Sequence, residues 1–168
     1  GAEGVGLFRT EVPFIVNERF PSEIEQTEIY RRQLEVFAPK KVTMRTLDVG
    51  GDKDLPYFPI NEANPFLGWR GIRVTLDHPE IFISQVRAML RASHKLENLQ
   101  IMLPMISSVG EVYSAMQLIK RAHGELWQEN LPVKLPPVDV RSNAAAPRRI
   151  VEGTAMAGTA GGRIESYR

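Results

Sequence analysis

The 168-residue sequence contains no cysteine, which excludes a disulfide framework, a thiolate metal site and a cysteine nucleophile and suits a reducing compartment. It has no apolar run near the roughly 20 residues that a membrane-spanning helix needs, and no charged and then apolar leader. Its formal net charge of +1 provides no sequence-wide attraction to nucleic acid or to an acidic membrane. We therefore expect a cytoplasmic protein with small or locally recognised partners, and no binding to nucleic acid or membrane.

An initiator methionine is also missing, since the sequence begins Gly1-Ala2-Glu3-Gly4, and we therefore expect an excised or processed segment. The remaining composition is that of an ordinary folded domain, with 43% hydrophobic and 24% charged residues. A chain of this length can bury a substantial core.

Strand and helix signals alternate along the chain. Two capping boxes, Ser22 with Glu25 and Ser108 with Glu111, mark helix starts, and apolar residues follow each at helical spacing. Runs of β-forming residues mark the strands. The expected elements are a helix over 22–37, a strand over 42–49, a long loop through Pro56, Pro59 and Pro65, a helix beginning near Pro79, a strand over 99–106 and a helix from Ser108 to about Leu126.

This order predicts the α/β class, with a parallel sheet and helical crossovers of either the barrel or the doubly wound type. A complete eightfold barrel needs about 250 residues. If the fold is a (β/α)8 TIM barrel, the chain can therefore hold only its first several units.

The composition changes after Val138. Residues 139–168 contain no lysine, and runs of alanine and glycine break any amphipathic face. Such a stretch buries too little apolar surface to offset its ordering entropy, so we expect a poorly ordered C-terminal tail. A translational frameshift, a cloning artefact or a gene-calling error would explain the change, a hypothesis that sequencing the coding DNA would test.

Three arginine-bearing patches could carry chemistry: GLFRTE at 6–11, MRTLDVGGDK at 44–53 and NPFLGWRGIR at 64–73. Arg45 lies inside an expected buried strand, where an unpaired guanidinium is costly, so it needs an anionic partner. That partner is either a ligand or a carboxylate of the chain, Asp48 or Glu11. The planar donor fork of arginine suits phosphate and carboxylate equally.

Other polar features carry weaker signals. Gly50-Gly51-Asp52-Lys53 could let backbone amides approach a phosphate, with Lys53 as a point charge, or could be only a turn. Gly1, Gly4 and Gly6 fail the dinucleotide fingerprint, because no strand of adequate length precedes them. The scattered histidines, His78, His94 and His123, show no metal-ligand spacing and are expected to be surface or satisfied residues.

At the three arginine patches the sequence closely resembles the enzyme I family of phosphoenolpyruvate-dependent phosphotransferase systems, with the motifs in the family's order and spacing. The stretch Gly50–Tyr57 and Trp69 before Arg70 favour enzyme I over pyruvate phosphate dikinase and phosphoenolpyruvate synthase. Residues 9–14 and 76–90 look most like the nitrogen-related paralogue. The resemblance covers residue 1 to about Val138.

The resemblance implies a partial phosphoenolpyruvate-utilising TIM-barrel domain over residues 1–138, with phosphoenolpyruvate at the C-terminal mouth of the barrel. Arg9 and Arg45 match the family's phosphoenolpyruvate-binding arginines, and Arg70 and Lys53 match weaker participants near the same phosphate. In the intact family, a homodimer, the phosphoryl group passes to a histidine on a separate domain and then to an HPr-like phosphocarrier protein.

The resemblance also implies Mg²⁺, but its ligands are absent here. The place of the family's metal-binding glutamate falls near Asn143, and an amide is a poorer partner than a carboxylate for a hard dication. The family's cysteine proton donor is missing too. We therefore expect no metal ligand and no catalytic residue in this fragment, which should be inactive alone. The alternative is a non-catalytic fragment or an interaction module.

Overall fold

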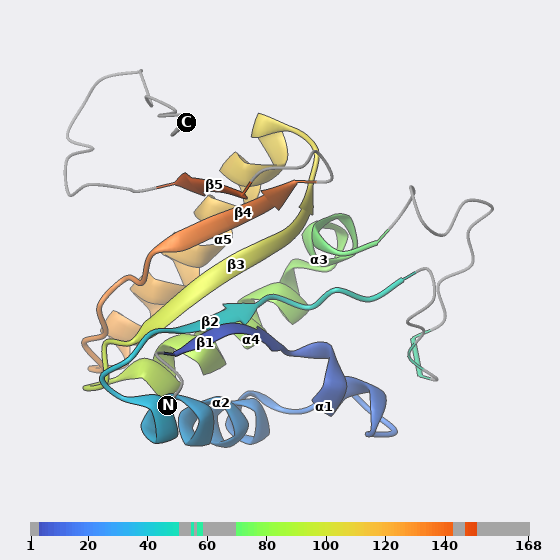
Figure 1. Ribbon diagram of the computed structural model, residues 1–168. Coiled ribbons are helices and arrows are strands. Elements are labelled where there is room, and N and C mark those ends of the chain that lie inside the picture. The colour runs from blue at the N-terminus through green and yellow to red at the C-terminus, as the bar shows by residue number, and fades with distance from the viewer. Residues whose placement is uncertain (1–3, 51–54, 56, 59–69, 143–146, 151–168) are drawn as a thin grey trace.

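The computed structural model describes residues 4–50, 55, 57–58, 70–142 and 147–150. Its elements are β1 (Val5–Arg9), α1 (Glu11–Ile15), α2 (Glu23–Phe37), β2 (Val42–Arg45), α3 (Ile72–Asp77), α4 (Pro79–Ser93), β3 (Leu99–Ile106), α5 (Val109–Gln128), β4 (Val138–Ser142) and β5 (Pro147–Ile150). The strands form one sheet in the order β1-β2-β3-β4-β5 (Figure 1). The first four are parallel, and β5 is antiparallel to β4.

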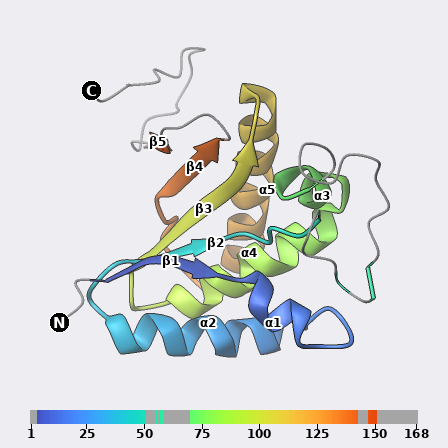
Figure 2. The ribbon, with the colours of Figure 1, turned by 45° about the vertical axis from the view of Figure 1, so that its right-hand side comes forward.

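The sheet resembles an arc of a barrel rather than a doubly wound sheet. Its parallel strands follow one another in chain order, and helices α2, α4 and α5 all lie against the same face (Figures 1 and 2). Doubly wound sheets carry helices on both faces, whereas a barrel keeps them on its outside. Within the described residues the sheet does not close, and its parallel order with helices on one face is that of the predicted partial (β/α)8 fold.

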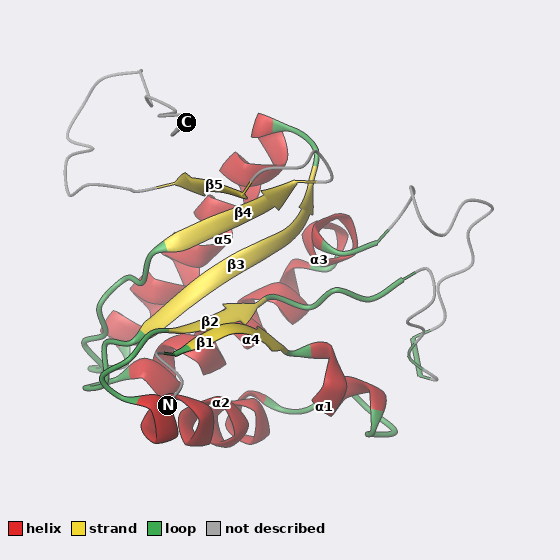
Figure 3. Ribbon diagram, in the orientation of Figure 1, coloured by secondary structure: helices red, strands yellow, loops and turns green. Residues whose placement is uncertain are grey.

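Local sequence signals explain the helix starts. The hydroxyl of Ser22 accepts a hydrogen bond from the backbone N–H of Glu25 at 3.3 Å, and the Glu25 carboxylate accepts one from the N–H of Ser22 at 2.7 Å. Ser108 and Glu111 make the same reciprocal pair ahead of α5. Pro79 opens α4 in the first turn, where a missing N–H costs nothing. Each predicted helix is therefore confirmed (Figure 3).

The structure adds one strand to the expected set and shortens another. Residues 5–9 form β1, which the sequence did not predict. A strand of five residues that includes a glycine shows little alternation of apolar and polar side chains, so the sequence gives no clear strand signal. β1 forms because it pairs with β2, Val5 with Val42 and Arg9 with Arg45. The strand expected over 42–49 ends its ladder at Arg45. The short helices α1 and α3 were also not expected.

β4 lies partly within the segment that was expected to be poorly ordered. It pairs in parallel with β3 from Ile101↔Val138 to Ile106↔Ser142, and backbone pairing of this kind leaves little trace in composition. The structure therefore differs from the expectation for residues 139–142 and for the backbone of 147–150. The rest of the expected tail, and most of the expected proline-rich loop, lie outside the described residues.

The main hydrophobic core fills the space between the sheet and the helix layer. Its largest fully buried members are Tyr30, Leu34, Met44, Ile72, Phe82, Met89, Leu90, Ile101 and Leu103. A smaller cluster lies toward the carboxyl ends of the strands and is built from Phe14, Leu47, Val49, Leu55 and Val74. Two separate apolar clusters thus support the sheet and the segments that follow β1 and β2.

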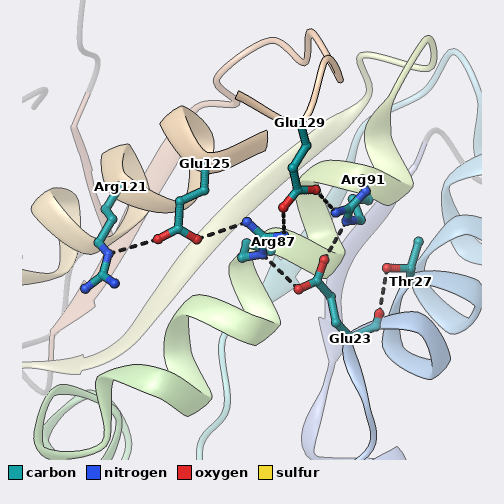
Figure 4. Close-up of polar contacts among 7 residues, drawn as sticks. All are labelled: Glu23, Thr27, Arg87, Arg91, Arg121, Glu125 and Glu129. Atoms are coloured by element: carbon teal, nitrogen blue, oxygen red, sulfur yellow. Dashed lines mark hydrogen bonds and ion pairs between the residues drawn. The ribbon is translucent and has the colours of Figure 1, made fainter. Parts of the chain in front are cut away.

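Ion pairs join the three long helices on the outside of the sheet (Figure 4). Glu23 of α2 accepts hydrogen bonds from Arg87 at 2.8 Å and from Arg91 at 2.5 Å, both on α4. Arg87 also donates to Glu125 of α5 at 2.9 Å and to Glu129 at 2.5 Å. The bond to Glu23 contributes most to raising the pKa of Arg87, which keeps that guanidinium charged. No helix in the described part of the chain is long and apolar enough to cross a membrane.

Candidate functional site

The two arginines singled out first in the sequence lie side by side at the carboxyl ends of neighbouring strands. Arg9 ends β1, Arg45 ends β2, and the two are register partners. Nε of Arg9 donates to Oε1 of Glu11 at 2.9 Å, and Nη2 of Arg45 donates to the same oxygen. Both guanidinium groups therefore converge on a single point, which a carboxylate oxygen occupies.

A second carboxylate extends this row. Nη1 of Arg45 lies 3.2 Å from Oδ2 of Asp48, and Nη2 of Arg70 lies 3.5 Å from the other Asp48 oxygen. Both carboxylates that the sequence offered as internal partners of Arg45 are thus its partners. The order Arg9, Glu11, Arg45, Asp48, Arg70 alternates in charge, and we call it the arginine row.

Arg9 is the most accessible of the five members of the row, and the other four are largely buried. The Glu11 side chain is 0% exposed and that of Arg45 is 13% exposed, whereas that of Arg9 is 54% exposed. Three cations face two carboxylates, so the row carries one formal positive charge in excess. Nε of Arg45 and Nε of Arg70 are buried and have no hydrogen-bond partner among the described residues. The excess positive charge of the row therefore favours binding of an anion, whereas these two Nε donors, being buried, are not open to it.

Gly71 holds Arg70 against the end of β2. Its φ of 57° and ψ of −125° suit glycine alone, and its N–H donates to the carbonyl of Val49 at 3.0 Å. A Cβ at this position would lie 3.0 Å from Cγ of Met105 and 3.2 Å from Oδ1 of Asp48. The glycine after Arg70 in the third patch is thus explained by close packing at the row.

Other residues named from the sequence lie away from the row or outside the described residues. Lys53 falls in the latter group, so its prediction stays a prediction. The histidines contact local partners, His78 with Glu80, His94 with the carbonyl of Pro132 and His123 with that of Val133. No group of three or more histidine, aspartate or glutamate side chains in the described segments could hold a metal ion. Asn143 lies outside those segments.

Sequence reasoning missed buried polar residues behind the row. Thr10, Tyr30 and Gln85 are each at most 1% exposed, and Gln85 donates a hydrogen bond to each of the other two. A signal was present for Gln85, because it interrupts the apolar face of α4 between Phe82 and Met89. A polar residue in an apolar stripe has to find its partners inside the protein.

Residues 1–140 match the protein family described as PEP-utilising enzyme, PEP-binding domain. The chain belongs to this family. A relative from Escherichia coli strain K12, named "Phosphoenolpyruvate-dependent phosphotransferase system", is 56% identical over 134 residues, which are 80% of this chain and 18% of the relative. The similarly named protein from Salmonella typhimurium is 59% identical over 124 residues, 74% of this chain and 17% of its own length.

A relative from Staphylococcus carnosus, named "Phosphoenolpyruvate-protein phosphotransferase", is 47% identical over 134 residues, 79% of this chain and 23% of the relative. These relatives confirm the resemblance to enzyme I. The chain spans about a fifth of the length of the curated relatives that it matches, between 17% and 23%.

Proposed function

We propose that the arginine row is the phosphoenolpyruvate-binding part of a phosphoenolpyruvate–protein phosphotransferase, with Arg9 and Arg45 as the principal ligands of the substrate's anionic groups. The observation that carries the proposal is the convergence of both guanidinium groups on one oxygen of Glu11 at the carboxyl ends of β1 and β2. Ligands of barrel enzymes bind at that end of the strands.

The chemistry of the row suits phosphoryl transfer, in which the protein mainly positions the substrate and stabilises negative charge. Two fixed guanidinium groups hold a phosphate by paired hydrogen bonds and offset the charge that spreads over its oxygens. Arg70 is the weaker participant, because it reaches the same point only through Asp48. An incoming anion would compete with Glu11 for the two leading arginines, so binding requires an exchange of ion-pair partners.

The remaining steps belong to the intact protein. We propose that it transfers the phosphoryl group to a histidine and then to an HPr-like phosphocarrier protein, works as a homodimer and resides in the cytoplasm. Mg²⁺ stays an expectation from the family resemblance. The chain alone should be inactive, since the described residues offer Arg9, Arg45 and Arg70 for binding but no phosphoryl acceptor at the row.

The nitrogen-related branch is the favoured origin. The matched 134 residues are 18% of the Escherichia coli relative but 23% of the Staphylococcus carnosus relative, so the former is the longer protein. It is also the more similar of the two, at 56% against 47% identity. The full reading frame of this protein would decide the branch, since a regulatory sensor domain ahead of the barrel would mark the nitrogen-related paralogue.

A non-catalytic role is the second candidate, and one observation favours it. Glu11 and Asp48 already pair with Arg45, so the row could serve only to hold the ends of β1 and β2 together. Buried arginines are commonly retained for such pairing. Ligand binding separates the two functions, because a purely structural row does not bind phosphoenolpyruvate.

Isothermal titration calorimetry of the full 168-residue chain with phosphoenolpyruvate tests the proposal. Arg9→Ala should weaken binding about tenfold or more, because one charge-assisted pair to the ligand is lost. Arg45→Lys should also weaken it, since lysine keeps the charge but not the planar fork. Arg121→Ala, at a 66% exposed position on α5, is the control and should bind like the wild type. Absence of binding at millimolar ligand, or equal binding by all variants, would refute the proposed site.

A further inference from the structure

The side chain of Gln85 is fully engaged inside the protein. Gln85 is 1% exposed, and its Nε2 donates to the hydroxyl oxygens of Thr10 and Tyr30, each at 3.1 Å. Its Oε1 accepts a hydrogen bond from the backbone N–H of Leu47 at 2.8 Å. Both amide hydrogens and the oxygen are used, so the amide has one orientation that leaves no buried polar group unpaired.

The partners of Gln85 lie within the two segments that carry the arginine row. Thr10 stands between Arg9 and Glu11, and its hydroxyl donates to the carbonyl oxygen of Arg45 at 2.6 Å. Leu47 stands between Arg45 and Asp48. One amide from α4 therefore binds both segments of the row: the hydroxyl of Thr10 in the first and the backbone N–H of Leu47 in the second.

The other side of the amide is tied to α2. The hydroxyl of Tyr30 accepts from Gln85 and donates to Oε1 of Gln26 at 3.1 Å, and Nε2 of Gln26 donates to the carbonyl of Pro21 at 2.8 Å. Burial raises the pKa of Tyr30, so its hydroxyl remains a donor throughout the physiological range. The bonds connect α2 through α4 to the ends of β1 and β2, and donation runs outward from Gln85, to Tyr30 on one side and to Thr10 on the other.

We infer that Gln85 is a positioning residue for the arginine row: it sets the spacing of the segments after β1 and β2, and thereby the convergence of Arg9 and Arg45. This inference rests on the proposed phosphoenolpyruvate site for its functional meaning. Gln85 touches no substrate and acts only through Thr10 and Leu47. Its function is to keep two arginines from different strands aimed at one point before any ligand arrives.

Two variants of the chain test the inference at different links. Gln85→Met keeps the length of the side chain and removes all three hydrogen bonds. Thr10→Val keeps the branched shape of the side chain and removes only the two hydrogen bonds of its hydroxyl. This smaller change provides the test if Gln85→Met does not fold. Val86→Ala is the matched control, because it removes part of a buried side chain from the next position of the same helix, within the main core.

Calorimetry with phosphoenolpyruvate is run at a temperature where every variant is folded. Gln85→Met and Thr10→Val should each weaken binding about tenfold, as expected when a preorganised ligand set loses its spacing. Val86→Ala should bind like the wild type even though it is less stable. A second readout needs no ligand: the ¹⁵N resonances of the arginine Nε–H groups of Arg9 and Arg45 should shift in the first two variants and stay in place in the control.

The outcomes separate this inference from the proposed function. If the wild type binds phosphoenolpyruvate and Gln85→Met loses no more affinity than Val86→Ala, the positioning role is wrong and the site stands. If the wild type does not bind, the proposed function fails, and the arginine resonances alone decide the positioning role. Unshifted resonances of Arg9 and Arg45 in both Gln85→Met and Thr10→Val would overturn it.

Discussion

Replacement of Arg45 by methionine removes the cation at the centre of the arginine row. Methionine fills a similar volume but cannot pair with Glu11 or Asp48, whose side chains are 0% and 5% exposed. Two carboxylates would then stay inside the protein with weaker compensation. We expect Arg45→Met to destabilise the chain strongly because of the charges it leaves behind, and only secondarily because of the contacts it removes.

The size of the effect follows from what each carboxylate retains. Removing one partner of a buried ion pair costs about 3–5 kcal/mol. Glu11 keeps the hydrogen bond from Arg9 at 2.9 Å, and Asp48 keeps the longer contact with Arg70 at 3.5 Å. We therefore expect the lower end of the range, about 3 kcal/mol, which is a large part of the stability of an ordinary domain.

Urea denaturation followed by circular dichroism measures this loss. With an m-value of about 2 kcal/mol/M, a loss of about 3 kcal/mol lowers the midpoint by about 1.5 M. Arg121→Met is the control, because an exposed pair within one helix contributes only about 0.3–0.5 kcal/mol. Adding Asp48→Asn to Arg45→Met should restore part of the stability, since it removes a buried charge that has lost its closer cation. A loss below about 1 kcal/mol, or a double variant less stable than Arg45→Met, would refute the reasoning.

Two further predictions concern a glycine and a carboxylate. Gly71→Ala should lower Tm by at least about 4 °C, because alanine is strained at this φ and its Cβ would press on Met105. Gly124→Ala in α5 is the control and should raise Tm slightly, because a Cβ there meets nothing within 4 Å. Equal shifts of Tm in the two variants would contradict this explanation. The bond from Arg87 lowers the pKa of Glu129 from its ordinary 4.5, so its stabilisation is present above pH 4.5 and fades below it. Urea midpoints should therefore fall less on acidification in Glu129→Gln than in the exposed control Glu28→Gln.

Short-range signals made the helices and the central strand predictable. A capping box needs only Ser22 and Glu25, or Ser108 and Glu111, three positions apart, and both boxes form as expected. β3 carries eight residues that are almost all buried, so its apolar run stands out in the sequence. The need of Arg45 for an anionic partner was predictable too, because a buried guanidinium requires one whatever the fold, and the structure shows that Glu11 and Asp48 are its partners.

The remaining features depend on partners far along the chain. β1 and β4 are five residues each and owe their ladders to β2 and β3, so neither leaves a periodic signal. The convergence of Arg9 and Arg45 depends on strand register, which no local pattern encodes. The link from Gln85 to Thr10 spans 75 positions, and only the packing of α4 against the sheet brings them together.

The ion pairs among α2, α4 and α5 determine where the protein can deform. Glu23 ties α2 to α4, and Glu125 ties α5 to the same Arg87, so none of the three helices can slide without breaking several charged contacts. The helix layer is therefore a support for the segments after β1 and β2, which Gln85 of α4 holds through Leu47 and Thr10. A ligand that draws Arg9 away from Glu11 would therefore exchange the ion pairs of the row while the segments stay where Gln85 holds them.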